Sequence, residues 1–320
     1  MKVSIIVPCF NVAEFIEKTI QSFANQTLND FEVIFIDDLS TDDSFNVINN
    51  YIKKYKLNGY VVKNSTNTGP SLARKMGIDM AQGDYCAFCD SDDWYDAQYL
   101  EFLYDATLNQ KNDIVFCNYR VVYSNGKILE RDSIGDVSDF KNKHCVLTIG
   151  IDSLCTGLYR RILLKDIIFP KMRNGEDMAI LPILIATASE FGFVKKPLYN
   201  YFHRAGSLST SHSVQVLSNL KYSFDFICSN IDKNNYGVEI EYLGIRNYLY
   251  SVVLSSLKLN LNKKEITKII SSFEDRFPLW KKNKYIKILP TYKRVFIMGV
   301  YYRWFYFLKI LSKIHTLISK

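Results

Sequence analysis

The stretch Tyr85-Cys86-Ala87-Phe88-Cys89-Asp90-Ser91-Asp92-Asp93-Trp94 decides how this sequence is interpreted. Its apolar first half predicts a strand covered on both faces, because such strands are continuous hydrophobic runs. Its second half places three carboxylates directly after that strand. Open α/β sheets bind ligands beyond the carboxyl ends of their strands, so this acidic turn is a candidate ligand site. The plainer alternative is an acidic turn that only caps the following helix.

Strand and helix patterns alternate on both sides of this stretch. We expect strands over residues 3–7, 31–36, 60–62 and 85–89, and helices over residues 15–23, 40–52, 70–81 and 97–108. Alternation of this kind indicates a mostly parallel sheet with right-handed crossovers. The predicted fold class is therefore α/β.

The pattern changes after residue 113. Residues 114–122 and 128–130 predict a hairpin around Asn125-Gly126, and residues 177–188 predict a helix. Two short strands are expected around Pro197. Beyond about residue 213 the pattern is helical, with a capping box at Asn262 and Glu265. We therefore predict an α/β domain over residues 1–210 and a helical extension over residues 211–320.

The acidic turn suggests a metal site. Like charges so close repel unless a cation joins them. Carboxylate oxygens suit Mn²⁺ or Mg²⁺, which in turn bridge phosphates.

Several segments, taken together in their order and spacing, carry a family resemblance. They are Ile5-Ile6-Val7-Pro8-Cys9-Phe10-Asn11, residues 32–42 with Asp37-Asp38-Leu39-Ser40-Thr41-Asp42, residues 67–74 from Asn67 to Arg74, and Gly83 to Asp93. The chain resembles the family 2 glycosyltransferases, which have the GT-A fold. This resemblance implies a Rossmann-like, nucleotide-binding and mostly parallel sheet. The resemblance is close over residues 1–110 and returns at residues 175–177 and 201–209. It implies inverting transfer of a sugar, most often from a UDP-sugar, to a hydroxyl of a glycan or lipid-linked acceptor in surface polysaccharide synthesis.

The resemblance also implies roles for residues at the donor site. Pro8, Phe10 and Asn11 would line the pocket for the base, and Asp38 would accept a hydrogen bond from it. Asn67 and Arg74 would lie near the base and the diphosphate, where a guanidinium suits phosphate oxygens. Ser91 lies in the acidic turn with Asp90, which would face the ribose or the metal, and with Asp92, which would ligate Mn²⁺ or Mg²⁺. Arg204 would neutralise the diphosphate. Leu39 departs from the family, which usually has glycine there.

Glu176 and Asp177 are the candidate catalytic pair. They follow the turn signal Asn174-Gly175 and begin an apolar helix. On the residues alone, two acids at a helix start are better explained by the helix dipole, which they stabilise by about 0.3–1 kcal/mol. The resemblance instead implies a general base here, with Asp177 as that base and Glu176 as the alternative or as a positioning residue.

The C-terminal forty residues carry the positive charge of the chain. Residues 281–320 contain ten lysines and arginines and no acidic residue, which leaves 30 basic and 33 acidic residues elsewhere. On one helix, Arg303, Lys309, Lys313 and Lys320 would share one face, and Phe296, Val300, Trp304, Phe307, Leu311, Ile314 and Ile318 the other. Such a helix suits peripheral contact with an anionic membrane. Packing of its apolar face on the protein itself is the alternative.

The cysteines and the basic segment bear on location and partners. Seven cysteines without regular spacing predict a reducing compartment, and with the basic segment they predict a cytoplasmic protein at the inner face of the membrane. A homo-oligomer is possible, and nucleic acid is not expected. A nucleotidyltransferase is the less favoured enzyme, because no Gly-rich basic loop follows the first strand. A catalytically inactive, transferase-like scaffold at the membrane is the non-enzymatic alternative.

Overall fold

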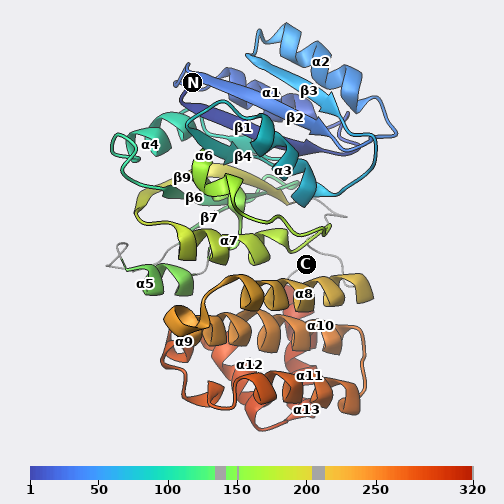
Figure 1. Cartoon of the computed structure of the whole chain (residues 1–320). Helices are drawn as coiled ribbons and strands as arrows, with labels where there is room; N and C mark the ends of the chain where they lie inside the picture. Colours follow the sequence, from blue (N-terminus) through green and yellow to red (C-terminus); the bar gives the residue numbers. More distant parts are fainter. Residues whose placement is uncertain (134–141, 150, 204–212, 319–320) are drawn as a thin grey trace. The chain divides into compact units, whose positions relative to one another are not determined.

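The chain divides into two compact units, Met1–Ser207 and Leu208–Lys320 (Figure 1). The structure is a computed structural model, and it describes residues 1–133, 142–149, 151–203 and 213–318.

The first unit is built on a mixed sheet of nine strands, as far as the described residues show. One half is parallel and runs in the order β3 (Gly59–Lys63), β2 (Phe31–Asp37), β1 (Val3–Cys9) and β4 (Tyr85–Phe88). The other half continues with β8 (Gly157–Arg160), β6 (Ile114–Tyr123), β9 (Phe191–His203) and β5 (Trp94–Tyr95), while β7 (Ile128–Arg131) pairs with β6. Among the described residues of this half, the β6–β9 pairing is parallel and the others are antiparallel. The parallel half brings the carboxyl ends of β1, β2 and β4 to one edge.

The predicted strands and helices of the parallel half are confirmed. The helices are α1 (Ile16–Ala24), α2 (Ser44–Lys54), α3 (Pro70–Met80) and α4 (Tyr99–Asp105). The predicted start of α2 at Ser40 is wrong, because the Ser40 hydroxyl accepts a hydrogen bond from the Asn11 backbone N–H and so ties this turn to β1. The helix begins four residues later, after Asp43.

The second half of the sheet differs more from the prediction. The hairpin turn at Asn125-Gly126 is confirmed, with Gly126 at φ 83°. The two short strands expected around Pro197 form the single strand β9, whose register shifts where Pro197 pairs with Asn118. Proline lacks a backbone N–H, so here it interrupts the ladder without ending it. Strand β8 was not predicted. Three further helices complete this unit, namely α5 (Lys143–Thr148), α6 (Arg161–Lys165) and α7 (Glu176–Thr187).

The second unit is helical, as predicted. It contains α8 (Val214–Asn230), α9 (Lys233–Leu243), the π-helical segment Gly244–Val252, α10 (Val253–Lys258), α11 (Lys263–Arg276), α12 (Thr291–Tyr301) and α13 (Phe305–Ile318). Buried aromatic rings of Phe224, Phe273 and Trp280 form its core. The predicted capping box of Asn262 and Glu265 is present at the start of α11. Among the described residues, no helix combines the length and hydropathy needed to cross a bilayer.

The single C-terminal helix expected from residue 294 onward is wrong. Arg303 adopts φ 57°, a left-handed conformation that ends α12 before α13 begins. Phe296 and Val300 are buried in the unit, whereas Trp304 and Ile314 are exposed. The residues of the predicted apolar face therefore do not share one face.

We expect Gly77→Ala to destabilise the protein, although alanine favours helices by about 1 kcal/mol. A Cβ at Gly77 in α3 would meet the Ile6 side chain of β1, and both residues are buried. Overpacking of this kind costs about 1–3 kcal/mol. Gly237→Ala in α9 is the matched control, because a Cβ there has no heavy atom within 4 Å. Urea unfolding should show a loss for the first variant and no loss for the second, and equal stability of the two would contradict this packing.

Candidate active site

Asp38 organises the loop beside the carboxyl end of β2. Its Oδ1 accepts hydrogen bonds from Asn64 Nδ2, Thr68 N and Thr68 Oγ1, and its Oδ2 accepts one from Gly69 N at 2.7 Å. Asn67 Nδ2 donates to the Asp38 carbonyl at 2.9 Å. Asp38 and Asn67 thus lie together, as the prediction requires. With Oδ1 fully used, a contact of Asp38 with a base is left to Oδ2.

The turn after β1 is fixed against the turn after β2. Asn11 adopts φ 53°, and its Oδ1 accepts hydrogen bonds from both the backbone N–H and the hydroxyl of Thr41. Phe10 beside it is 49% exposed, so its ring is available to stack on a base, while Pro8 is half-buried. Leu39 adopts φ 63°, a left-handed conformation that glycine takes without steric cost. The shape of the turn is therefore retained despite the leucine.

The three carboxylates of the acidic turn have two different environments. Asp90 and Asp92 are partly exposed, whereas Asp93 is buried. Asp93 accepts hydrogen bonds from the Tyr199 hydroxyl and from the Phe202 backbone N–H, which join the turn to β9. Burial, followed by the charges of Asp90 and Asp92, raises the pKa of Asp93 well above its usual range. Asp93 is thus a structural member of the turn, as is buried Ser91, whose carbonyl accepts from the α1 residue Thr19.

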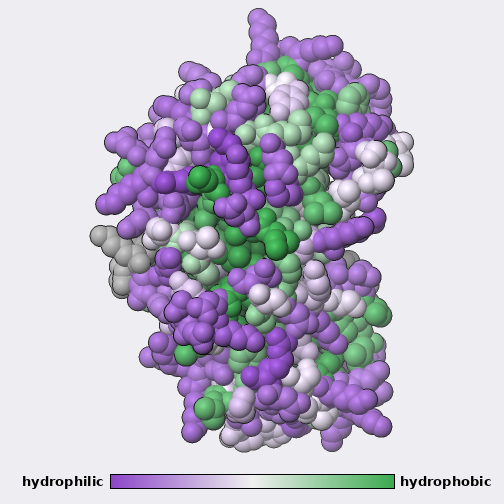
Figure 2. Space-filling model, viewed as in Figure 1, coloured by the Kyte–Doolittle hydropathy of each residue, from purple (hydrophilic) through white to green (hydrophobic). Residues whose placement is uncertain are grey.

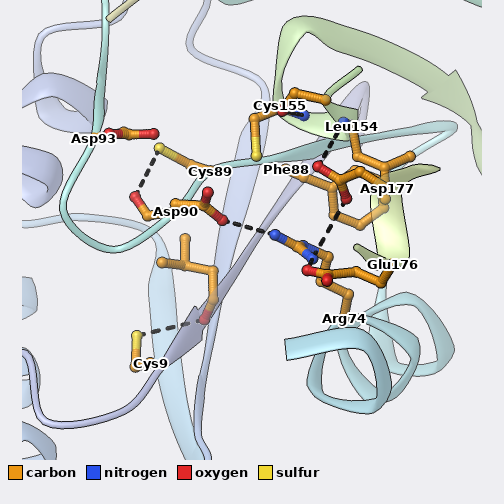
Figure 3. A network of polar contacts seen from close by, with 12 residues as sticks. Cys9, Arg74, Phe88, Cys89, Asp90, Asp93, Leu154, Cys155, Glu176 and Asp177 are labelled. Atoms are coloured by element: carbon orange, nitrogen blue, oxygen red, sulfur yellow. Dashed lines mark hydrogen bonds and ion pairs between the residues drawn. The ribbon is translucent and has the colours of Figure 1, made fainter. Parts of the chain in front are cut away.

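Arg74 is the centre of the site (Figure 3). Its side chain is 2% exposed and extends from α3 toward three carboxylates. One terminal nitrogen donates to Asp90 Oδ1 at 2.7 Å, and the other donates to Glu176 Oε1 at 2.6 Å and lies 3.7 Å from Asp177 Oδ1. Both ends of the guanidinium are therefore occupied by protein carboxylates, and the predicted contact of Arg74 with a diphosphate stays a prediction.

The two acidic residues at the start of α7 differ in what they contact. Glu176 is held by Arg74, whereas Asp177 Oδ2 accepts from the Leu154 backbone N–H at 3.2 Å. Asp177 Oδ1 is buried and has no hydrogen-bond partner among the described residues. Burial is the main cause that raises the pKa of Asp177 to about 7; Glu176 and Asp90 add to it, and Arg74 and the Leu154 N–H offset it in part. Asp177 therefore has the free oxygen and the pKa that a general base requires near neutral pH.

Two contacts in the site, made by Arg173 and Tyr199, were not predicted from the sequence. Arg173 donates to Asn67 Oδ1 at 3.1 Å, so a second arginine lies at the loop that Asp38 organises. Its position just before Asn174-Gly175-Glu176 was a usable signal. The Tyr199 hydroxyl that holds Asp93 had no such signal. Arg204 lies outside the described residues.

Asp90 and Asp92 could provide part of the ligands of a metal ion, with a bound diphosphate providing others. The described part of the chain holds no group of three or more His, Cys, Asp or Glu side chains arranged around a possible metal position. Asp90 and Asp92 offer two partly exposed hard-oxygen ligands. Mg²⁺ bound to phosphates needs one or two protein carboxylates, so these residues suit Mn²⁺ or Mg²⁺ completed by a diphosphate. The cysteines of the described residues are free, and Cys86 and Cys89 are buried in the core.

Comparison with known proteins identifies the family. Residues 4–168 match the model for glycosyl transferase family 2, which is more than half of the chain. The chain belongs to this family. The resemblance found in the sequence is thus confirmed, and a glycosyltransferase is favoured over a nucleotidyltransferase.

Individual relatives support the same assignment. The chain is 32% identical over 235 residues to a cholesterol galactosyltransferase of Borreliella burgdorferi, and the match covers 68% of this chain and 65% of that protein. It is 33% identical over 185 residues to a poly(ribitol-phosphate) beta-glucosyltransferase of Bacillus spizizenii, covering 55% of this chain and only 28% of that protein. The chain therefore spans less than two thirds of either relative.

A solved structure shares the fold over nearly the whole chain. S. aureus TarS 1-349 in complex with UDP-GlcNAc matches with a TM-score of 0.73 and 20% identity, over 99% of this chain and 92% of that one. The expected GT-A fold with a helical C-terminal region is therefore confirmed.

We expect Arg74→Ala to destabilise the protein strongly. The substitution leaves Glu176, Asp177 and Asp90 without the buried cation that they share, and breaking a buried ion pair costs about 3–5 kcal/mol. Lys75→Ala is the control on the same helix, because Lys75 pairs with Asp79 at the surface and such a pair contributes about 0.5 kcal/mol or less. Chemical unfolding compares the two variants. Similar losses in both would show that Arg74 does not hold the carboxylates together.

Proposed function

We propose that this protein is a metal-dependent, inverting glycosyltransferase that moves a sugar from a UDP-sugar to a hydroxyl of a glycan or lipid-linked acceptor in surface polysaccharide synthesis. The observation that carries the proposal is Asp177, a partly buried carboxylate whose Oδ1 has no hydrogen-bond partner among the described residues and whose pKa is raised to about 7. It is joined through Arg74 to Asp90 of the acidic turn, so the candidate base and the donor-binding turn share one ion-pair network.

A UDP-sugar is the preferred donor for two reasons. The fold neighbour TarS has been solved with UDP and with UDP-GlcNAc. In this chain, exposed Phe10 and the second oxygen of Asp38 offer a stacking surface and a hydrogen-bond acceptor at neighbouring strand ends. Uracil presents a flat ring and an N–H donor, which match both features.

The reaction follows from these positions. Asp177 takes the proton of the acceptor hydroxyl, whose oxygen forms the new bond to the anomeric carbon. The bond from that carbon to the diphosphate oxygen breaks, and its electron pair leaves with UDP. Attack from the face opposite the leaving group inverts the anomeric centre. Asp92 and Asp90 would hold Mn²⁺ or Mg²⁺, which would supply positive charge for a leaving diphosphate. As the family resemblance implies, Arg204 would add to that charge.

The acceptor is proposed from chemistry shared by relatives. Cholesterol and poly(ribitol-phosphate), which appear in the names of two relatives, both carry hydroxyl groups. The first is a lipid and the second a polymer. A hydroxyl on a lipid-linked or growing glycan is chemically similar to both of these acceptors.

A donor screen tests the proposal. We expect release of UDP from one sugar nucleotide in a panel of UDP-, GDP- and dTDP-sugars, with acceptor glycolipids present and with Mn²⁺ or Mg²⁺ added. Asp92→Ala should lose this turnover and its metal dependence, while Asp105→Ala, an exposed acid at the end of α4, should keep both. Absence of both turnover and metal-dependent nucleotide binding would instead support the inactive scaffold.

The pH profile tests the base. Asp177 must be ionised to accept a proton, and its pKa of about 7 predicts that kcat/KM rises with pH and levels off above about 7. Asp177→Asn should lower kcat by about 10²–10⁴-fold while UDP still binds. Glu176→Gln is the comparison, because Glu176 is held by Arg74. If that variant removed the rise with pH and Asp177→Asn did not, Glu176 would be the base.

A further inference from the structure

Exposed hydrophobic side chains concentrate near the C-terminus. Half of the large hydrophobic side chains exposed in the described residues lie between Leu279 and Leu317. On the face seen in Figure 2, green patches interrupt the hydrophilic surface of the helical unit. Such patches commonly mark interaction sites.

Helix α13 carries an outward apolar stripe. Its members are Tyr306, Ile310, Ile314 and Leu317, of which Tyr306 is 82% and Leu317 is 75% exposed. At about 100° per residue, all four fall within about 80° of the helix circumference. The stripe is therefore one surface along the helix.

Aromatic side chains continue this surface at the turn before α13. Tyr302 and Trp304 are exposed and stack with ring centroids 5.0 Å apart, and Tyr301 packs edge-on against Tyr302 at 4.5 Å. Tryptophan and tyrosine have an apolar body and a polar edge, which suits them to the boundary between lipid and water.

The opposite face of α13 holds the helix on its own unit. Leu308 and Ser312 are buried, Lys258 Nζ lies 3.2 Å from His315 Nδ1, and the Lys263 ammonium lies over the Phe305 ring. These contacts hold α13 in place and do not involve the residues of the outward stripe. The stripe is therefore available to bind another surface.

The positive charge on the outward face of α13 favours an anionic partner. Lys309 and Lys313 are exposed and lie next to the apolar stripe on the helix circumference. Arg303, which the sequence placed with them, instead pairs with Glu274 at 2.6 Å. Two copies of this face would bring lysines together with no acidic residue from residues 281–320 between them, so self-association is disfavoured. An anionic bilayer provides both the apolar depth and the opposite charge.

We propose that the outward face of α13 binds an anionic membrane surface. The stripe of Tyr306, Ile310, Ile314 and Leu317 enters the boundary of the acyl chains, and Lys309 and Lys313 contact the headgroups. The helix lies in the plane of the interface and does not cross it. This surface goes beyond the proposed transfer reaction, because it does not depend on the residues around Asp177.

Vesicle flotation of the full chain tests this surface. Wild type should float with vesicles that contain phosphatidylglycerol and stay behind with vesicles of phosphatidylcholine alone. The variant Tyr306→Ser/Ile310→Ser/Leu317→Ser should lose flotation. Lys309→Ala/Lys313→Ala should bind about 20- to 30-fold more weakly, and binding of wild type should fall with added salt.

Matched variants separate this surface from general effects. Lys264→Ala/Lys268→Ala removes two exposed lysines at the same spacing from α11, and Ile128→Ser/Ile162→Ser/Ile168→Ser removes three exposed apolar side chains from the first unit. Both should float like wild type. Equal flotation of all variants, or none by wild type, would overturn the proposal. So would a multimer in sedimentation velocity without lipid that only the α13 variants dissociate, because this face would then join two copies.

Discussion

The buried guanidinium of Arg74 is the constraint on which the site depends. The Arg74 side chain is buried, so its charge must be balanced by the protein. The balance comes from the acidic turn after β4 and from the first residues of α7, which are far apart in the sequence. By binding both, Arg74 sets the distance between the acidic turn and the candidate base. Glycine at position 77 then lets α3, which carries Arg74, lie close on β1.

Arg74 interacts differently with Glu176 and with Asp177. Glu176 receives its hydrogen bond and is thereby fixed, while Asp177 feels its charge at a longer distance and keeps Oδ1 free. Without that charge, burial would raise the pKa of Asp177 still further and leave it protonated at neutral pH. Arg74 is thus suited to keep the base usable while holding its neighbour in place.

Much of the fold could be predicted because the signals are local. The strands and helices of residues 1–110 are read from periodicity, and the end of β4 pointed to the acidic turn. The features that could not be predicted depend on contacts between residues far apart in the sequence. Strand β8 has four residues and pairs between β4 and β6, and the environment of Arg74 is made by residues 16 and 102 positions away. A helix wheel could not show that Arg303 turns left-handed and pairs with Glu274.

Charge balance gives a physical reason for the metal that we propose. Asp90, Glu176 and Asp177 lie around the Arg74 guanidinium, and Asp92 follows in the same acidic turn as Asp90, so the site is acidic before any donor arrives. In the proposed function, a nucleoside diphosphate would add further negative charge beside Asp90 and Asp92 and would be repelled unless cations entered with it. Arg173 donates to Asn67 and would supply one cation at the base side, but no described contact joins it to the acidic turn. A divalent ion held by Asp90 and Asp92 would supply positive charge that offsets this repulsion.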